Sequence, residues 1–167
     1  MAGLSATITF DDRRVIGALD RLGSLERDTK PLLDAIGTGL VASTEMRFQS
    51  NTAPDGTPWA PLNPAYAEFR RPGPILVQSA ALMRSITFRA GYHTLRIGSP
   101  MIYAGVHQWG ATIRPVRAKA LAFEMGGHLV LARKVTIPAR PYLGISDEDE
   151  EMILETVDRI VGRILGV

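Results

Sequence analysis

The chain has 167 residues, no cysteine and a formal charge of +2. This length fits one domain that can bury a core without disulfides or metals. The lack of cysteine excludes disulfides, thiolate zinc sites and cysteine nucleophiles. No window approaches the ~18 apolar residues of a membrane span, and the first ten residues lack the basic segment of a secretory signal. We therefore expect a soluble protein made in the cytoplasm.

The small net charge hides an uneven distribution along the chain. Residues 1–69 carry 6 basic and 9 acidic side chains, whereas residues 141–167 carry 2 basic and 7 acidic ones. Residues 70–140 carry 11 basic side chains and a single acidic one, Glu124, a balance of +10. Three interpretations are open: contact with nucleic acid, charge complementarity between copies, or oppositely charged elements packed within one subunit.

Hydrophobic periodicity predicts three elements before residue 50. Alternation over residues 4–10 predicts a strand, and spacings of three and four predict an amphipathic helix over residues 12–27. A second, longer helix follows down to about Gln49, with Pro31 in its first turn, where a missing N–H is harmless. Its expected core stripe is Leu32, Leu33, Ile36, Leu40 and Met46.

The stretch from Ser50 to Pro74 holds six prolines, a density that rules out regular structure over most of it. We expect a long exposed loop or arm that is mobile in the isolated subunit. It carries Trp59 and the basic pair Arg70 and Arg71. Its aromatic residues are either anchors for a partner or, in the case of Trp59, a cover folded back over the core.

Short elements follow the loop. Residues 79–84 predict a helical turn, residues 85–98 a hairpin around Gly91, and residues 101–109 a short helix ended by Gly110. In the first hairpin Ile86, Phe88, Leu95 and Ile97 are expected to face the core. In the short helix the apolar spacing selects Ile102, Val106 and Trp109.

A second hairpin and a last helix complete the chain. The hairpin spans residues 121–131, turns at Gly126-Gly127 and is followed by the basic pair Arg133 and Lys134. The helix begins after Ser146, where carboxylates meet the positive end of the helix dipole. Its expected buried face is Ile153, Leu154, Val157, Ile160, Val161 and Ile164. Residues 1–167 thus form one α+β domain: a short antiparallel sheet of hairpins flanked by N-terminal helices and a C-terminal helix.

The segment from Thr136 to Gly144 is rigid, because Pro138 and Pro141 fix φ on either side of Arg140 and withhold backbone donors. One interpretation is a connector that leads into the last helix and is anchored in the core by its apolar side chains. The other is a presented arginine that, with Tyr142, lies at or beside a subunit or partner interface.

Few residues of this sequence are candidates for catalysis. His93, His107, His128 and Glu124 form no H-E-x-x-H or H-x-x-x-H pair, so we expect no metal site, no cofactor and no catalytic residue. His107 is the best single candidate, and a structural or interface role suits it better than catalysis. A metal-dependent hydrolase is the weakest of the alternatives.

The basic residues are dispersed over strands and loops and form no recognition helix, which argues against sequence-specific DNA reading. They remain suited to DNA phosphates or to a protein partner, so a DNA-contacting neck or binding module is the main alternative function. These contact candidates are Arg70, Arg71, Arg114, Arg117, Lys119, Arg133 and Lys134.

Several pieces in one order resemble the Mu G-like phage virion morphogenesis family, the tail-completion proteins of the head–tail neck. They are Phe48 with Pro-Asp-Gly-Thr-Pro-Trp-Ala-Pro-Leu at 54–62, Leu-Met-Arg-Ser-Ile at 82–86, Ile-Gly-Ser-Pro at 97–100, Tyr-Ala-Gly-Val-His-Gln-Trp-Gly at 103–110, and Ile-Pro-Ala-Arg-Pro-Tyr-Leu-Gly at 137–144. The chain departs from the pattern in Ala80-Ala81, where Ser-Gly is expected, and in a short loop after Leu62.

The resemblance implies a non-enzymatic virion component, made in the bacterial host cytoplasm, that completes the tail so that a filled head can join it. It implies a ring-shaped homo-oligomer around the axial DNA channel, in contact with neighbouring neck or tail proteins and with no membrane. Interface candidates are Arg140, Tyr142, Trp59, His107 and Trp109.

Overall fold

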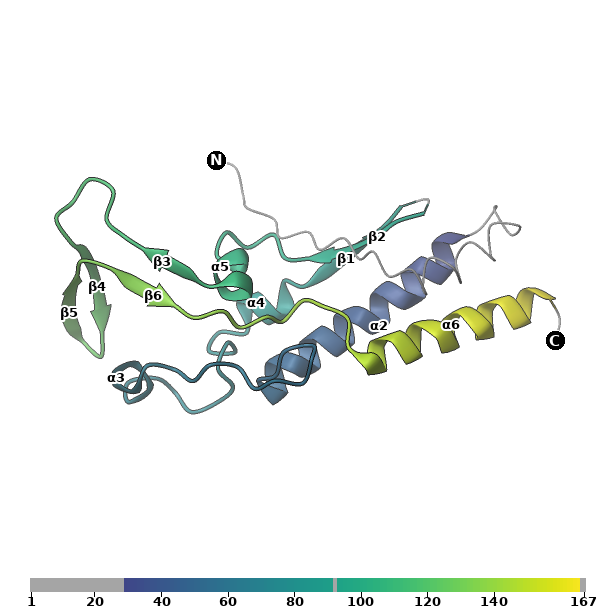
Figure 1. The fold of residues 1–167 in the computed structure, drawn as a ribbon, viewed down its shortest axis with the longest axis horizontal. Helices are drawn as coiled ribbons and strands as arrows, with labels where there is room; N and C mark the ends of the chain where they lie inside the picture. The colour runs from purple at the N-terminus through teal and green to yellow at the C-terminus, as the bar shows by residue number, and fades with distance from the viewer. Residues whose placement is uncertain (1–28, 92, 166–167) are drawn as a thin grey trace.

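The computed structural model describes residues 29–91 and 93–165 (Figure 1). The strand and helix expected over residues 4–10 and 12–27 lie outside the described residues. The helices are α2 (Thr29–Ser50), α3 (Pro64–Ala67), α4 (Ala81–Arg84), α5 (Ala104–Trp109) and α6 (Asp147–Leu165). The strands are β1 (Thr87–Ala90), β2 (Leu95–Gly98), β3 (Ala111–Ile113), β4 (Leu121–Met125), β5 (His128–Ala132) and β6 (Val135–Ile137). The predicted α+β class is confirmed.

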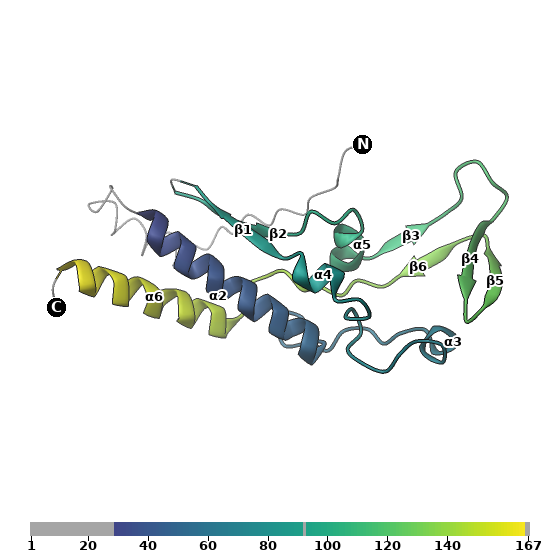
Figure 2. The same cartoon turned by 180° about the vertical axis from the view of Figure 1, so that it is seen from behind.

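The molecule is elongated, with helices at one end and a strand hairpin at the other. Helices α2 and α6 run antiparallel side by side, and the β1–β2 hairpin lies along α2 (Figures 1 and 2). The β3–β6 ribbon leads away from this body to β4–β5 at the far end, where α3 also lies (Figures 1 and 2). We call β3, β6, β4, β5 and the loops that join them, residues 111–137, the strand arm.

The strands form three separate two-stranded ribbons in place of the one short sheet that was expected. In the ribbon nearest the helices Thr87 pairs with Gly98, and Ile86 and Ile97 are buried as predicted. Phe88 covers α2 at Gly37, where an added Cβ would lie 2.4 Å from the ring. Glycine at this position therefore lets the ribbon lie directly on the helix.

The buried faces of three helices differ in part from the predicted ones. Leu32, Leu33, Ile36 and Leu40 of α2 are buried as predicted, but Met46 is 71% exposed, because the face continues through Thr44, Arg47 and Phe48. In α6 Leu154 was expected to be buried but is 42% exposed, whereas Ile153 and Val157 are buried as predicted. Of the apolar residues expected to be buried in the short helix, Ile102 lies before α5 and is exposed, and Trp109 at its end is also exposed; the buried positions of α5 are Ala104, Gly105 and Gln108.

The proline-rich loop has two different halves. Its first half folds back on the body: Ala53 and Trp59 are buried, and their amides donate to the carbonyls of Thr57 and Asn51. From Pro61 to Phe69 the side chains are exposed apart from the half-buried Leu62, and α3 provides the one helical turn there. The expectation of a long exposed loop is thus wrong for the first half, because Trp59 covers the core.

A buried ion pair joins the two long helices. Arg47 of α2 donates to the carboxylate of Asp149 in the first turn of α6, and the two side chains are 7% and 3% exposed. The Asp149 carboxylate also accepts from the Ser146 amide, at 3.0 Å, so that it caps its own helix. Both charges have partners, which is the condition for burying them without a large penalty.

We predict that Asp149→Ala lowers the free energy of unfolding by about 3–5 kcal/mol, because it leaves the Arg47 guanidinium buried without its counter-ion. Urea denaturation followed by circular dichroism measures this change. Arg47→Met also removes the donors to the carbonyls of Tyr142 and Gly144, so the pair is tested by a double-mutant cycle: Arg47→Met/Asp149→Ala should lose less stability than the sum of the two single variants. Additive losses would contradict an energetic role for the pair.

Candidate functional site

The segment from Pro141 to Gly144 passes through the middle of the molecule outside any helix or strand, yet each of its four carbonyls accepts a side-chain hydrogen bond. Trp59 Nε1 donates to Pro141 O at 2.7 Å, and Gln108 Nε2 donates to Leu143 O at 2.9 Å. Arg47 donates to Tyr142 O and Gly144 O at 3.2 and 2.8 Å. Buried backbone needs such partners wherever no neighbouring strand supplies them.

The amides of the same segment are held by α5. Gln108 Oε1 accepts from the amides of both Tyr142 and Leu143, each at 3.0 Å, so one glutamine satisfies three groups of the segment. The amide of Arg140 donates to His107 O at 2.7 Å. The segment is therefore paired with α5 much as a strand is paired with its neighbour.

Aromatic side chains fill the space under this segment. Tyr142 is fully buried, its ring lies 5.1 Å from that of Phe48, and its hydroxyl donates to Ala104 O at 3.1 Å. Trp59 meets Phe48 edge to face at 5.6 Å. Burial raises the pKa of Tyr142 to about 12. The three rings form the centre of the core. Of the three apolar side chains that could anchor the segment, Tyr142 and Leu143 are buried in this core, whereas Ile137 is half-buried and outside it.

Arg140 fixes the proline-rich loop to the core. Its side chain is buried and donates to Ala60 O at 2.8 Å and to Pro61 O at 2.9 Å. Both of these partners are carbonyls of the proline-rich loop. Since Arg140, Tyr142 and Trp59 are all buried within the subunit, little of their surface is open to a partner, and their interface role stays a prediction.

We predict that Arg140→Glu lowers the melting temperature of the isolated subunit by roughly 10 °C, since a carboxylate there faces two carbonyls in a buried site. Differential scanning calorimetry measures the shift. Arg133→Glu, a charge reversal at an exposed position of the strand arm, is the matched control and should change little. A normal melting curve for Arg140→Glu would show that the hydrogen bonds from Arg140 to the loop carbonyls do not stabilise the subunit, and would favour a direct interface role.

His107 lies beside this arginine on α5. Its Nδ1 is buried and has no hydrogen-bond partner in the described part of the chain. Burial and the nearby charge of Arg140 lower the pKa of the imidazole below its ordinary value of 6.5. The Tyr103 ring packs against it edge to face, with centroids 6.0 Å apart. His107 is therefore a neutral packing group at neutral pH.

We predict that stability falls as the pH drops from 7.5 to 5.5, because the unfolded chain gains a proton near pH 6.5 that folded His107 resists. The slope contributed by one such histidine cannot exceed ~1.4 kcal/mol per pH unit. His107→Gln should flatten this dependence in denaturation curves at several pH values. His128→Gln, at an exposed hairpin position, should retain it. An unchanged slope in His107→Gln would rule out this role.

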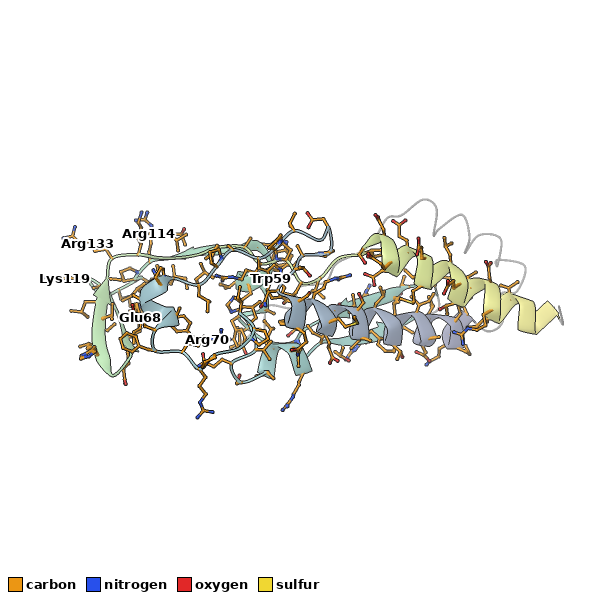
Figure 3. All side chains as sticks on the ribbon, turned by 90° about the horizontal axis from the view of Figure 1, so that it is seen from below. Trp59, Glu68, Arg70, Arg114, Lys119 and Arg133 are labelled. Carbon is orange, nitrogen blue, oxygen red and sulfur yellow. The ribbon has the colours of Figure 1, made fainter. Side chains whose placement is uncertain are left out.

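The remaining contact candidates lie on the surface. Trp109 is 58% exposed at the end of α5. Arg114, Lys119 and Arg133 gather at the strand-arm end of the molecule, opposite α6 (Figure 3). The exposed cations of this arm, hereafter the arm cations, are Arg114, Arg117, Lys119, Arg133 and Lys134. Arg70 is not one of the arm cations. Its side chain donates hydrogen bonds to the carbonyls of Gly73 and Pro74 in the proline-rich loop.

The residues that hold the segment from Pro141 to Gly144 were not predicted from the sequence. Arg47, Gln108 and Asp149 are polar residues at buried helix positions, and periodicity alone assigns such residues to the surface. One signal was available: Arg47 lies at helical spacing from Leu40 and Thr44 and next to Phe48. Within residues 29–91 and 93–165 no three potential metal ligands lie together, and no helix there has the length and apolarity to span a membrane.

Comparison with known families identifies the class of protein. The model of the phage virion morphogenesis family matches residues 10–162, nearly the whole chain. The chain belongs to this family, and the resemblance found in the sequence is confirmed.

Two relatives come from Mu and a Mu-like prophage. The chain is 33% identical over 168 residues to "Putative capsid assembly protein G" of Escherichia phage Mu, covering 97% of each chain. It is 28% identical over 146 residues to "Mu-like prophage FluMu G protein 2" of Haemophilus influenzae, covering 87% of each. No solved structure matches the chain.

Proposed function

We propose that this chain is a non-enzymatic virion component that completes the tail at the head–tail neck, so that filled heads can join. The observation that carries the proposal is the membership of residues 10–162 in the phage virion morphogenesis family. It is made in the bacterial host cytoplasm and then becomes part of the neck or tail. Its partners are further copies of itself, arranged as a ring, and the adjoining neck or tail proteins.

The organisation of the subunit supports an assembly role. The residues that attract interest as a site, Arg140, Gln108 and Tyr142, use their polar atoms on backbone groups of the chain itself. They hold the core, the proline-rich loop and α6 in one arrangement and so present fixed outer surfaces. A neck component needs such a rigid body with surfaces for several neighbours.

The phage Mu relative is named as a capsid assembly protein, which favours a second candidate function, a role in assembling the capsid. The two roles act at different stages. A head-assembly factor is needed before DNA fills the capsid, whereas a tail-completion protein is needed only when finished heads and tails meet.

We predict that deleting the gene from its phage leaves filled heads and separate tails, and that the wild-type chain supplied in trans restores joined particles. Electron microscopy of lysates, with particle counts, measures this. The destabilised Asp149→Ala variant should restore fewer joined particles, and Arg89→Glu, an exposed position on β1, provides a folded comparison. Empty or aberrant heads in the deletion would assign the chain to capsid assembly, and normal joined particles would overturn both roles.

A further inference from the structure

One face of the β4–β5 hairpin is apolar and uncovered. Ala122 pairs with Leu131 and Glu124 with Leu129, so these four side chains share one face of the ribbon. All four are exposed, and the two leucines are 72% and 67% exposed. We call these four residues the leucine face.

The leucine face is part of a structure that is marginal alone. A two-stranded ribbon in water needs a further layer against its apolar face to be stable. The opposite face is less exposed, since its residues Leu121, Met125, Val130 and Ala132 are half-buried. Phe69 from the proline-rich loop packs at Gly126 in the turn of the hairpin, where an added Cβ would lie 2.4 Å from its ring. The leucine face has no cover in the described chain, and the arm cations flank it at the base of the hairpin.

A surface of complementary character lies on α6. Asp147, Glu151, Leu154, Glu155 and Asp158 are exposed. Asp147, Glu151 and Glu155 follow at steps of four, Leu154 lies three residues after Glu151, and Asp158 lies three after Glu155, which places all five on one side of the helix. We call these five residues the acidic stripe. Leu154 is 42% exposed within it, an apolar position surrounded by carboxylates. Its counterpart on the hairpin is two leucines flanked by cations.

We infer that the leucine face and arm cations of one subunit bind the acidic stripe of a second copy of this chain. The two surfaces lie at opposite ends of the elongated molecule, so one subunit does not bring them together (Figures 1 and 3). A contact between different surfaces of identical chains is heterologous, and it propagates until a ring closes. This inference rests on the proposed function and adds to it the surfaces that form the ring.

DNA is a poorer occupant of the same surface. Phosphates pair with the arm cations but leave both leucines in water, and they repel Glu124, which lies on the leucine face. Against α6 the leucines are covered, and Glu124 faces a helix that also carries the exposed Arg159. The mixed apolar and charged character therefore favours a protein surface.

Charge reversal tests the contact with the full chain. Arg117→Glu/Lys119→Glu/Arg133→Glu reverses three of the five arm cations and leaves that set with a net negative charge. Glu151→Lys/Glu155→Lys/Asp158→Lys reverses three of the four carboxylates of the acidic stripe and leaves it with a net positive charge. Each variant alone should lose self-association by about 100-fold or more, because like charges then meet. A 1:1 mixture should recover it, since both contacts become complementary again in an alternating ring. Multi-angle light scattering and sedimentation velocity give the masses.

The matched control is Arg89→Glu/Arg96→Glu, which reverses two exposed, cross-strand paired charges on the β1–β2 hairpin. It should assemble like the wild type. Leu129→Ser/Leu131→Ser should also lose association, with an unchanged helical circular dichroism spectrum. The inference is overturned by a monomeric wild-type chain, by variants that assemble normally, by a mixture that does not recover, or by variants that lose only DNA affinity in a filter-binding assay.

Failure of this contact is distinguishable from failure of the proposed function. The phage complementation assay reports on head–tail joining, and light scattering reports on self-association. If the charge-reversed variants still form rings and still join heads to tails, the inferred contact is wrong and the proposed function is unaffected. If self-association depends on these surfaces but deletion of the gene leaves head–tail joining normal, the proposed function is wrong and the inferred contact is unaffected.

Discussion

The buried backbone of residues 141–144 imposes the constraint on which the rest of the structure depends. Four carbonyls lie in a row outside any strand, and each must be hydrogen bonded or cost on the order of 1–3 kcal/mol. Arg47, Trp59 and Gln108 meet this need from α2, the proline-rich loop and α5. Three parts of the chain that are distant in sequence are thereby fixed around one extended segment.

The same segment determines how the ends of the molecule are related. On one side it continues from β6 and hence from the strand arm, and on the other it leads into α6. Arg47 holds it directly and also pairs with Asp149, so the start of α6 is tied to the carbonyls that precede it. Arg140 adds the proline-rich loop. The strand arm and α6 are thus attached to one well-packed centre and present surfaces in fixed directions.

This organisation separates stability from assembly. The polar residues with the most partners are buried and hold the subunit together, whereas the leucine face, the arm cations and the acidic stripe are exposed. A two-stranded ribbon with exposed leucines is a weak element in an isolated chain. In the inferred contact, a second copy of the chain covers these leucines and supplies the missing layer of the ribbon.

The sequence by itself determined the elements whose cause is local. Proline density, glycine turns and helix spacing predicted α2, both hairpins, α6 and the anchoring role of Tyr142, and the ordered motifs predicted the family. Only the tertiary structure decided which polar groups are buried. Met46 and Leu154 face outward, and Arg47, Asp149 and Gln108 face inward, because the irregular segment needs donors and acceptors there. Hydrophobic periodicity measures apolarity along one element, so it does not register a polar side chain whose partner is another segment's backbone.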